Sequence, residues 1–321
     1  MNMFLHGALL VSGLIILVKG ADWLVTGASE FARKQSVSDL TIGLTVVAFG
    51  TSAPELVVNV YSSMYDHHDM VFGNILGSNI FNLFMILGLA GMISPLAVQS
   101  TTVWKEIPFS LLAVLTLLVL TNVAFQPDDP GLSRLDGLIL LGFFAGFMFY
   151  IYRQLQKDPV KAEITETSLS NAKTWLLILA GLAGLTAGGQ LLVSNAVAVA
   201  RIMNMSEQLI GLTIVAAGTS LPELATSVVA ALKKNNDIAV GNIIGSNIFN
   251  IFLILGVSSV LRPIAYDHIF NRDMLVLGLG TTFLFVAMFT GEKWKLDRWE
   301  ATILFAAFLG YMVTLIQGAT G

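Results

Sequence analysis

The segment VVAFGTSAPELVVNV, residues 46–60, decides how this chain is interpreted. It lies inside a long apolar stretch, yet its middle carries Gly50, Thr51, Ser52, Pro54 and Glu55. Glycine and proline interrupt helices, and a carboxylate at the centre of a membrane-spanning helix costs about 2.5–3.5 kcal/mol. The segment therefore predicts a helix that is broken at this point and whose polar residues have a function.

The composition around this segment is typical of a membrane protein. Of 321 residues, 55% are hydrophobic and 12% are charged, whereas a soluble domain carries about a quarter charged residues. Apolar blocks of about 20 residues, the length that a helix needs to cross a bilayer, recur along the whole chain. They predict an all-α polytopic membrane protein with ten transmembrane helices, at 4–27, 38–64, 70–93, 107–125, 136–152, 174–200, 208–232, 238–260, 273–290 and 299–316.

The interrupted segment occurs twice. IGLTVVAFGTSAPEL at 42–56 returns as IGLTIVAAGTSLPEL at 210–224, and GNILGSNIFNLFMILG at 73–88 returns as GNIIGSNIFNIFLILG at 241–256. The copies are 168 residues apart without a gap, and 27 of the 47 positions are identical, with the polar residues among the best matched. Since the copies are five spans apart, the second should cross the membrane in the opposite sense. Inverted repeats with Gly- and Pro-interrupted segments indicate a secondary transporter, with its substrate site where the segments meet near the midplane.

The basic residues predict the orientation. With the N-terminus outside, the inside loops hold twelve Lys and Arg residues and the outside loops hold four, Arg134, Arg201, Arg262 and Arg272. This distribution follows the positive-inside rule. It makes both termini external and predicts a multi-pass protein of the plasma (inner) membrane. The chain then divides into a first five-helix half, 1–152 with its repeat at 42–88, a cytoplasmic linker, 153–173, and a second half, 174–321 with its repeat at 210–256.

Ser52 and Glu55 allow two interpretations. Their S-x-x-E spacing, with a proline between them, is that of a capping box at a helix start, and Ser220 and Glu223 repeat it. A cap contributes only about 0.5–2 kcal/mol, which is less than the cost of placing a carboxylate within the membrane. We therefore favour a functional role, because ionisable residues within the membrane are functional candidates by default.

The motif offers hard oxygen ligands. A break before Ser52 would free carbonyl groups around Ala48 and Phe49. Two facing copies would bring Glu55 and Glu223 together with four hydroxyl groups. Carbonyl, hydroxyl and carboxylate oxygens suit Na⁺ or Ca²⁺ rather than soft metals.

The second repeated block offers further oxygens. Ser78 and Asn82 are four residues apart and share a helical face, and Ser246 and Asn250 match them. Small polar residues also pack membrane helices closely, and we favour that role for the glycines and for Asn79 and Asn247. For the four residues on the shared faces we favour ion coordination.

The paired GTSxPEL and GNxxGSNIxN motifs resemble the α-repeats of the Ca²⁺:cation antiporter superfamily, in its sodium/calcium exchanger family of the prokaryotic type. The resemblance covers both halves of the chain. It implies two inverted five-helix repeats, with ion sites at the midplane between helices 2, 3, 7 and 8. Carried over position by position, the family's ligands fall on Thr51, Ser52, Glu55, Ser78 and Asn82, on Thr219, Ser220, Glu223 and Ser246, and on the backbone carbonyls of Ala48 and Ala216.

One position departs from the family pattern. Many sodium/calcium exchangers carry Asp where this chain has Asn250, which matches Asn82 of the first repeat. With Asn250 as a neutral ligand, the site would hold two carboxylates, which still neutralise one Ca²⁺. The number of Na⁺ ions exchanged and the identity of the driving ion stay open.

These features predict a secondary active antiporter that exchanges Ca²⁺ for Na⁺ by alternating access. An H⁺-driven antiporter on the same fold is the alternative, because apolar surroundings favour a protonated carboxyl group. A channel is a further possibility, which differs from an antiporter in that its flux would need no counter-ion gradient. We do not expect an enzyme, because the sequence lacks an H-E-x-x-H motif, a nucleophile–base pair and cysteine. We expect no cofactor beyond the transported ions, and as partners inorganic cations and the lipid bilayer, without nucleic acid or an obligate protein.

The segment YDHHD, residues 65–69, places two histidines between two aspartates in a loop that we expect to be external. It could hold a surface metal ion. A solvated turn is the commoner outcome for such a sequence, and we favour that interpretation.

Overall fold

The computed structural model describes residues 3–122, 131–157, 169–203 and 216–320, and these residues are helical apart from four very short strands and the turns and loops between elements. The first half contains α1 (Met3–Gln35), α2 (Asp39–Ile42), η1 (Gly43–Val47), α3 (Ala48–Thr51), α4 (Ala53–Met64), α5 (His68–Ile80), η2 (Phe81–Ile86), α6 (Leu87–Ile93), η3 (Thr102–Glu106), α7 (Ile107–Asn122) and α8 (Arg134–Lys157). The second half contains α9 (Asn171–Ile202), α11 (Ala216–Gly218), α12 (Leu221–Leu232), α13 (Asn236–Ile248), η5 (Phe249–Leu255), α14 (Gly256–Leu261), η6 (His268–Phe270), α15 (Asn271–Ala287) and α16 (Arg298–Thr320). The segments η1, η2, η3 and η5 are π-helical.

Eight helices in the described ranges are long and apolar enough to cross a membrane, or nine when the bent pair from Asp39 to Met64 counts as one. This agrees with the predicted all-α membrane protein. The seventh predicted span, 208–232, begins outside the described residues, and its described part ends in the 12-residue helix α12. Most of the predicted linker, 158–168, also lies outside them. The total of ten spans stays a prediction.

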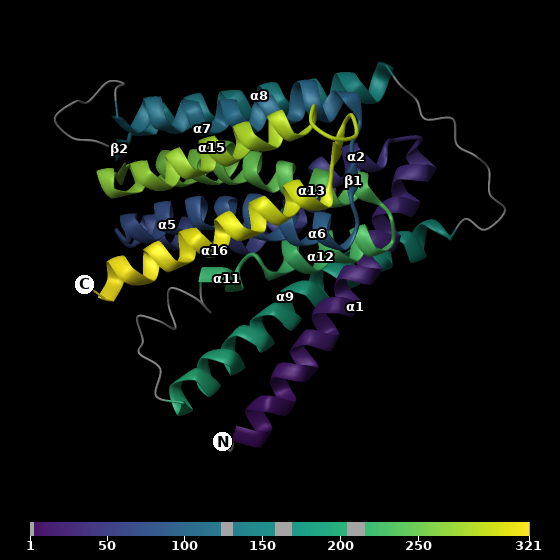
Figure 1. Cartoon of the computed structure of the whole chain (residues 1–321), viewed down its shortest axis with the longest axis horizontal. Helices are drawn as coiled ribbons and strands as arrows, with labels where there is room; N and C mark the ends of the chain where they lie inside the picture. The colour runs from purple at the N-terminus through teal and green to yellow at the C-terminus, as the bar shows by residue number, and fades with distance from the viewer. Residues whose placement is uncertain (1–2, 123–130, 158–168, 204–215, 321) are drawn as a thin grey trace.

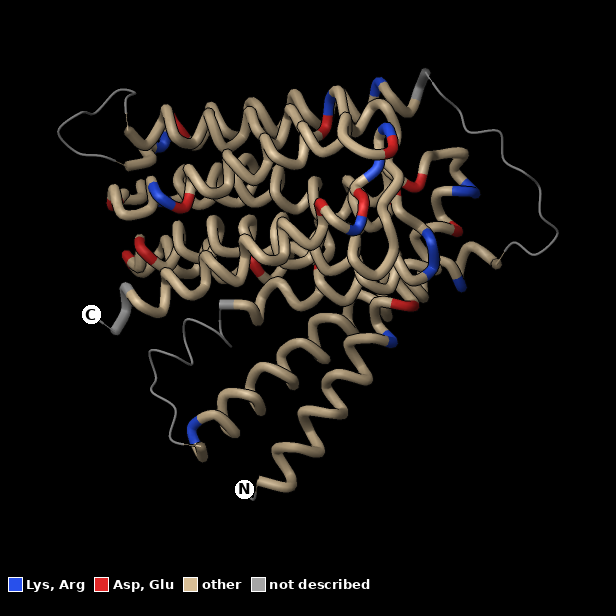
Figure 2. Tube along the Cα trace, viewed as in Figure 1, with Lys and Arg blue, Asp and Glu red and all other residues tan. Residues whose placement is uncertain are grey.

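The charged residues lie mostly toward the two ends of the bundle. Figure 2 shows long uncharged stretches of helix between these ends. That distribution is expected for helices whose middles lie in hydrocarbon, where an ionised side chain is costly.

The long helices α1 and α9 lie side by side and slant away from the other helices (Figure 1). Glycines allow them to touch. A Cβ atom added to Gly20 would lie 2.7 Å from the backbone nitrogen of Leu185, and one added to Gly188 would lie 2.6 Å from that of Leu17. Small residues at such positions let membrane helices approach closely.

The helices that carry the repeated motifs form the centre of the molecule. Within the most apolar 18-residue window, the segment Asn236–Leu261 is 94% buried and its counterpart His68–Ile93 is 72% buried, compared with 17% for Arg298–Gln317. The equivalent helices α4 and α12 begin at Ala53 and Leu221, which are 168 residues apart, so the sequence repeat is also a structural repeat.

Two strand pairs connect the halves. β1 (Leu96–Ala97) pairs antiparallel with β4 (Lys295–Leu296), and β2 (Gly131–Leu132) pairs with β3 (Ile264–Ala265). Each pair joins a loop of the first half to a loop of the second.

Candidate ion-binding site

The predicted helix break is present in the first repeat. α3 ends at Thr51, α4 begins at Ala53, and Ser52 lies between them with φ −84° and ψ 4°. The helical segments on either side meet at an angle of 47°. Pro54 occupies the first turn of α4, where its missing N–H costs no helical hydrogen bond. In the second repeat Ser220 precedes α12 with nearly the same backbone angles, φ −88° and ψ 7°.

The two serines do not cap these helices. Neither Ser52 nor Ser220 makes a side-chain cap hydrogen bond. Instead the Ser52 hydroxyl donates to Oε1 of Glu223 at 3.0 Å, and the Ser220 hydroxyl donates to Oε1 of Glu55 at 3.5 Å. The capping-box interpretation is therefore wrong, because each hydroxyl points across the repeat interface to the carboxylate of the other copy.

Both carboxylates are deeply buried, with Glu55 and Glu223 each 1% exposed. Ser246 adds a second hydroxyl near Oε1 of Glu223, at 3.5 Å. No ion pair with a basic residue involves either carboxylate within the described residues. Two buried carboxylates need a compensating positive charge, which a cation or bound protons can supply.

The asparagines of the second block lie where regular helix gives way to π-helix. Asn82 lies in η2 and Asn250 in η5, and π-helical turns occur frequently at functional sites. The Asn82 amide donates to Oδ1 of Asn247 at 3.1 Å, and the Asn250 amide donates to Oδ1 of Asn79 at 2.8 Å. This interlocking fixes the orientation of all four amides.

Asn79 and Asn247 connect the two central helices directly. The Asn79 amide donates to the backbone oxygen of Asn247 at 3.2 Å, and the Asn247 amide donates to that of Asn79 at 3.4 Å. This geometry agrees with the packing role that the sequence favoured for these two residues.

Several buried oxygens of the predicted ligand set have no hydrogen-bond partner within the described part of the chain. They are Oε2 of Glu55, Oε2 of Glu223, Oγ of Ser78, Oδ1 of Asn82 and Oδ1 of Asn250. A buried polar atom without a partner costs about 1–3 kcal/mol, so this group of atoms needs an explanation. Acceptor oxygens from both repeats that lack donors are the expected lining of a cation site.

The backbone carbonyl groups of Ala48 and Ala216 were both predicted as ligands. The Ala48 carbonyl is not freed by the break, because it accepts a hydrogen bond from the Ser52 backbone nitrogen at 3.0 Å. The helix hydrogen bond persists across the bend, which leaves that oxygen one further lone pair. Ala216 is the first residue after the undescribed range 204–215 and begins α11.

Sequence reasoning missed Asn74 and Asn242. The Thr51 hydroxyl donates to Oδ1 of Asn242 at 3.0 Å, and the Thr219 hydroxyl donates to Oδ1 of Asn74 at 3.3 Å. These asparagines orient the threonines of the opposite repeat. Their signal was available, since both occupy the second position of the duplicated GN dipeptide.

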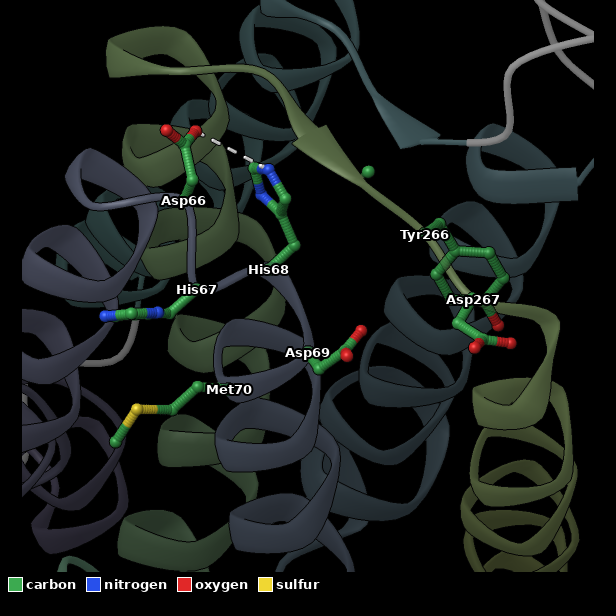
Figure 3. Close-up of a pocket in the computed structure, with 8 residues that line it drawn as sticks. Asp66, His67, His68, Asp69, Met70, Tyr266 and Asp267 are labelled. Atoms are coloured by element: carbon green, nitrogen blue, oxygen red, sulfur yellow. Dashed lines mark ion pairs between the residues drawn. The ribbon is translucent and has the colours of Figure 1, made fainter.

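The YDHHD segment forms part of a separate cavity of about 650 Å³, together with residues 265–267. His68 lies 3.6 Å from Asp66, which also pairs with Arg262 at 2.6 Å. Figure 3 shows the His67 ring pointing away from that of His68. Nowhere in the described ranges do three or more His, Asp or Glu side chains gather in an arrangement that could hold a metal ion.

Comparison with known proteins places this geometry in context. Residues 5–153 and 173–317 match the family model described as sodium/calcium exchanger protein. The chain is 40% identical over 316 residues to the putative antiporter CaxA of Alkalimonas amylolytica, covering 95% of this chain and 97% of that protein. It is 30% identical to the sodium/calcium exchanger MaX1 of Methanosarcina acetivorans, covering 96% and 97%.

The fold is similar to a solved structure of the sodium-calcium exchanger NCX_Mj soaked with zero Na⁺ and Ca²⁺. The TM-score is 0.83 at 31% identity, covering 98% of this chain and all of the other. A family match over most of the chain, full-length relatives and a shared fold agree with one another. The chain belongs to the sodium/calcium exchanger family, a family of membrane antiporters.

Proposed function

We propose that this protein exchanges Ca²⁺ for Na⁺ across the plasma (inner) membrane by alternating access. The observation that carries the proposal is that Glu55 and Glu223 are buried, each with a hydroxyl of the opposite repeat on one carboxylate oxygen and no hydrogen-bond partner on the other. Two carboxylates balance one Ca²⁺ or two Na⁺, so one site can hold either ion in turn. Such competition for a shared charge is what couples the two fluxes in an antiporter.

The proposed ligand set is the one that the motifs predicted. The carboxylates of Glu55 and Glu223 supply the charge. The remaining oxygens come from the hydroxyls of Thr51, Ser52, Ser78, Thr219, Ser220 and Ser246, the amide oxygens of Asn82 and Asn250, and the carbonyls of Ala48 and Ala216. Oxygen ligands of this kind suit hard cations. No resident cofactor enters the proposal.

In the proposed topology, ten transmembrane helices form two inverted five-helix repeats, with both termini external and 153–173 in the cytoplasm. The reciprocal contacts of Ser52 with Glu223 and of Ser220 with Glu55 support a two-fold relationship between the repeats. Alternating access then follows from movement of one group of helices against another around a fixed site.

H⁺-driven exchange on the same fold is the second candidate. The burial of Glu55 and Glu223 without an ion pair in the described part of the chain supports it, because two bound protons would neutralise the two carboxylates as one Ca²⁺ would. In this version two protons replace two Na⁺ ions.

Ca²⁺ uptake into proteoliposomes distinguishes the candidates. One set of vesicles is loaded with Na⁺ and has the same pH inside and outside, and the other is acidic inside and has the same Na⁺ concentration on both sides. Ca²⁺ uptake that follows the Na⁺ gradient is the expected result. Uptake that follows only the pH gradient would select the proton-driven version, and uptake without either gradient would indicate a channel.

A further inference from the structure

A second cavity, of about 400 Å³, lies between α15 and α16. Its walls are apolar and partly open to the surroundings of the bundle, since Leu279 is 61% exposed and Ile303 is 45% exposed. Its floor includes Phe84 of η2. Arg272, in the first turn of α15, is the one charged residue among the described residues that line it.

The two halves of the chain can be compared directly at this place. Phe144 of α8, in the first half, packs edge-on against Phe249 of η5, in the second half, with ring centroids 5.0 Å apart. Phe308 of α16, in the second half, packs edge-on against Phe81 of η2, in the first half, at 5.5 Å. These matching contacts identify α8 and α16 as equivalent walls behind η5 and η2.

In the first half the equivalent space is filled by aromatic rings. Phe143, the residue before Phe144, stacks on Phe252 at 5.3 Å with only 11° between the ring planes. Phe109 of α7 packs against Phe252 at 5.9 Å and against Phe147 at 5.2 Å. Together these side chains form a plug behind η5.

In the second half the plug is incomplete. The residue before Phe308 is Ala307, which lines the cavity together with Phe84, Phe283 and Tyr311. One aromatic side chain of the plug, Phe143, is thus replaced by a smaller one. A tyrosine also donates to a carboxylate of the neighbouring segment in each half, Tyr150 to Glu106 and Tyr311 to Asp273, although Tyr150 lies six residues after Phe144 and Tyr311 only three after Phe308.

The residue before each of these carboxylates is basic. In the first half Lys105 lies over the Tyr150 ring at 5.3 Å. In the second half Arg272 lines the cavity. A guanidinium group binds phosphate oxygens through two parallel hydrogen bonds.

We propose that this cavity binds an anionic phospholipid, with one acyl chain between α15 and α16 and the phosphate on Arg272. Protein interiors have few voids larger than a water molecule, and an apolar cavity does not retain water. In a membrane protein the acyl chain of a neighbouring lipid supplies the missing contact surface. The acyl chain performs beside Ala307 the packing that Phe143 performs in the first half.

The lipid would complete the wall behind the helix that carries Asn82. Phe84 lies two residues after Asn82 in the same π-helical segment, and the ring packs so tightly on Gly280 that an added Cβ there would lie 2.1 Å from it. Lipid in the cavity therefore supports η2 from the side opposite the candidate site.

The experiment measures lipid binding to the purified protein by native mass spectrometry, with phosphatidylglycerol and phosphatidylcholine as probes. Ala307→Phe fills the cavity as Phe143 does. Ala306→Phe is the matched control, because Ala306 is exposed and does not line the cavity. We expect Ala307→Phe to lose one tightly bound phosphatidylglycerol, which Ala306→Phe retains. Equal retention by both variants overturns the proposal.

Arg272→Gln leaves the apolar walls intact and tests the headgroup contact. It therefore keeps the proposal testable if Ala307→Phe folds poorly. Wild type should bind phosphatidylglycerol about tenfold more tightly than phosphatidylcholine, because the choline cation of the latter offsets the phosphate charge that Arg272 would attract. The variant should bind both equally. A preference that survives in Arg272→Gln overturns the proposal. These readouts do not depend on transport, so they stand apart from the test of the proposed function.

Discussion

The hydroxyl of Ser52 donates a 3.0 Å hydrogen bond to Glu223, which lies 171 residues further along the chain. Ser220 makes the corresponding contact with Glu55 at 3.5 Å. Each repeat thus supplies a hydroxyl to the carboxylate of the other, and neither repeat surrounds its own glutamate alone. A change in one repeat should therefore alter the ion affinity of the whole site.

Glu223→Gln should reduce Ca²⁺ transport by about 100-fold or more, and Glu55→Gln should do the same. The amide keeps the shape of the side chain but removes one of the two negative charges. Breaking a buried ion pair costs about 3–5 kcal/mol, and each 1.4 kcal/mol is a factor of ten. The measurement is Na⁺-driven ⁴⁵Ca²⁺ uptake into proteoliposomes.

Glu106→Gln is the matched control for that measurement. Glu106 is equally buried, but its carboxylate accepts a hydrogen bond from Tyr150 away from the repeat interface. The variant should transport at nearly the wild-type rate. A two-carboxylate site is refuted if Glu55→Gln or Glu223→Gln also transports at that rate.

Ser52→Ala should weaken the apparent Ca²⁺ affinity about fivefold, since a hydrogen bond contributes about 1 kcal/mol, and leave thermal stability nearly unchanged. Ser38→Ala provides the contrast, because Ser38 is a true cap that accepts a hydrogen bond from the Thr41 nitrogen at 3.2 Å. That variant should lose about 1 kcal/mol of stability with its Ca²⁺ affinity unchanged. If the two variants behave alike, the Ser52–Glu223 contact has no role in ion binding.

Gly20→Ala should destabilise the contact between α1 and α9 by about 1–3 kcal/mol. The added methyl group would lie 2.7 Å from the Leu185 nitrogen and 2.9 Å from the Gly181 oxygen, and backbone atoms cannot move aside as a flexible side chain can. Gly7→Ala, on the same helix, meets nothing within 4 Å and should be neutral or slightly stabilising. Thermal unfolding of the two variants in detergent measures the difference.

Single cysteines test the predicted orientation, because the chain contains none of its own. Ala172 and Ile269 are both exposed at helix ends. Ile269→Cys should react with a membrane-impermeant maleimide in intact cells, whereas Ala172→Cys should react only after the cells are opened. Labelling of both from the outside would contradict the three spans predicted between these two positions.

The fold was largely predictable, because membrane helices are recognised from their length and hydropathy and because Gly50 and Pro54 mark the break at Ser52. The direction of the Ser52 hydroxyl could not be predicted. A capping box and a cross-repeat hydrogen bond use the same residues at the same spacing, and only the position of Glu223 in space separates them.

The π-helical segments also could not be predicted from the sequence. The amino-acid sequence of Phe81–Ile86 does not distinguish π-helix from α-helix, since the change in hydrogen bonding depends on what packs around Asn82 and Asn250. Asn74 and Asn242, by contrast, were visible in the duplicated block. Their role could have been inferred from their polarity in an otherwise apolar helix.

In the proposed site Asn250 is a neutral ligand, so it should limit the charge that the site can balance. Its amide nitrogen donates to Oδ1 of Asn79 at 2.8 Å, which leaves its own Oδ1 without a donor. Glu55 and Glu223 alone match one Ca²⁺ or two monovalent ions. A third Na⁺ would lie in a buried site without a matching carboxylate, at a cost of several kcal/mol. We therefore expect exchange of two Na⁺ for one Ca²⁺, with little dependence on membrane potential.

Asn250→Asp should add a cation site and make exchange dependent on potential, because moving one net charge across 100 mV is worth about 2.3 kcal/mol. The substitution also places a carboxylate oxygen against Oδ1 of Asn79, so some stability should be lost. Asn82→Asp, which faces Asn247 in the same way, controls for that loss and should add charge at the equivalent place. The measurement is Na⁺-driven Ca²⁺ uptake with the potential clamped by K⁺ and valinomycin. Potential-dependent exchange in the wild type that stays the same in Asn250→Asp would show that Asn250 does not set the stoichiometry, since the added carboxylate would then have recruited no further ion.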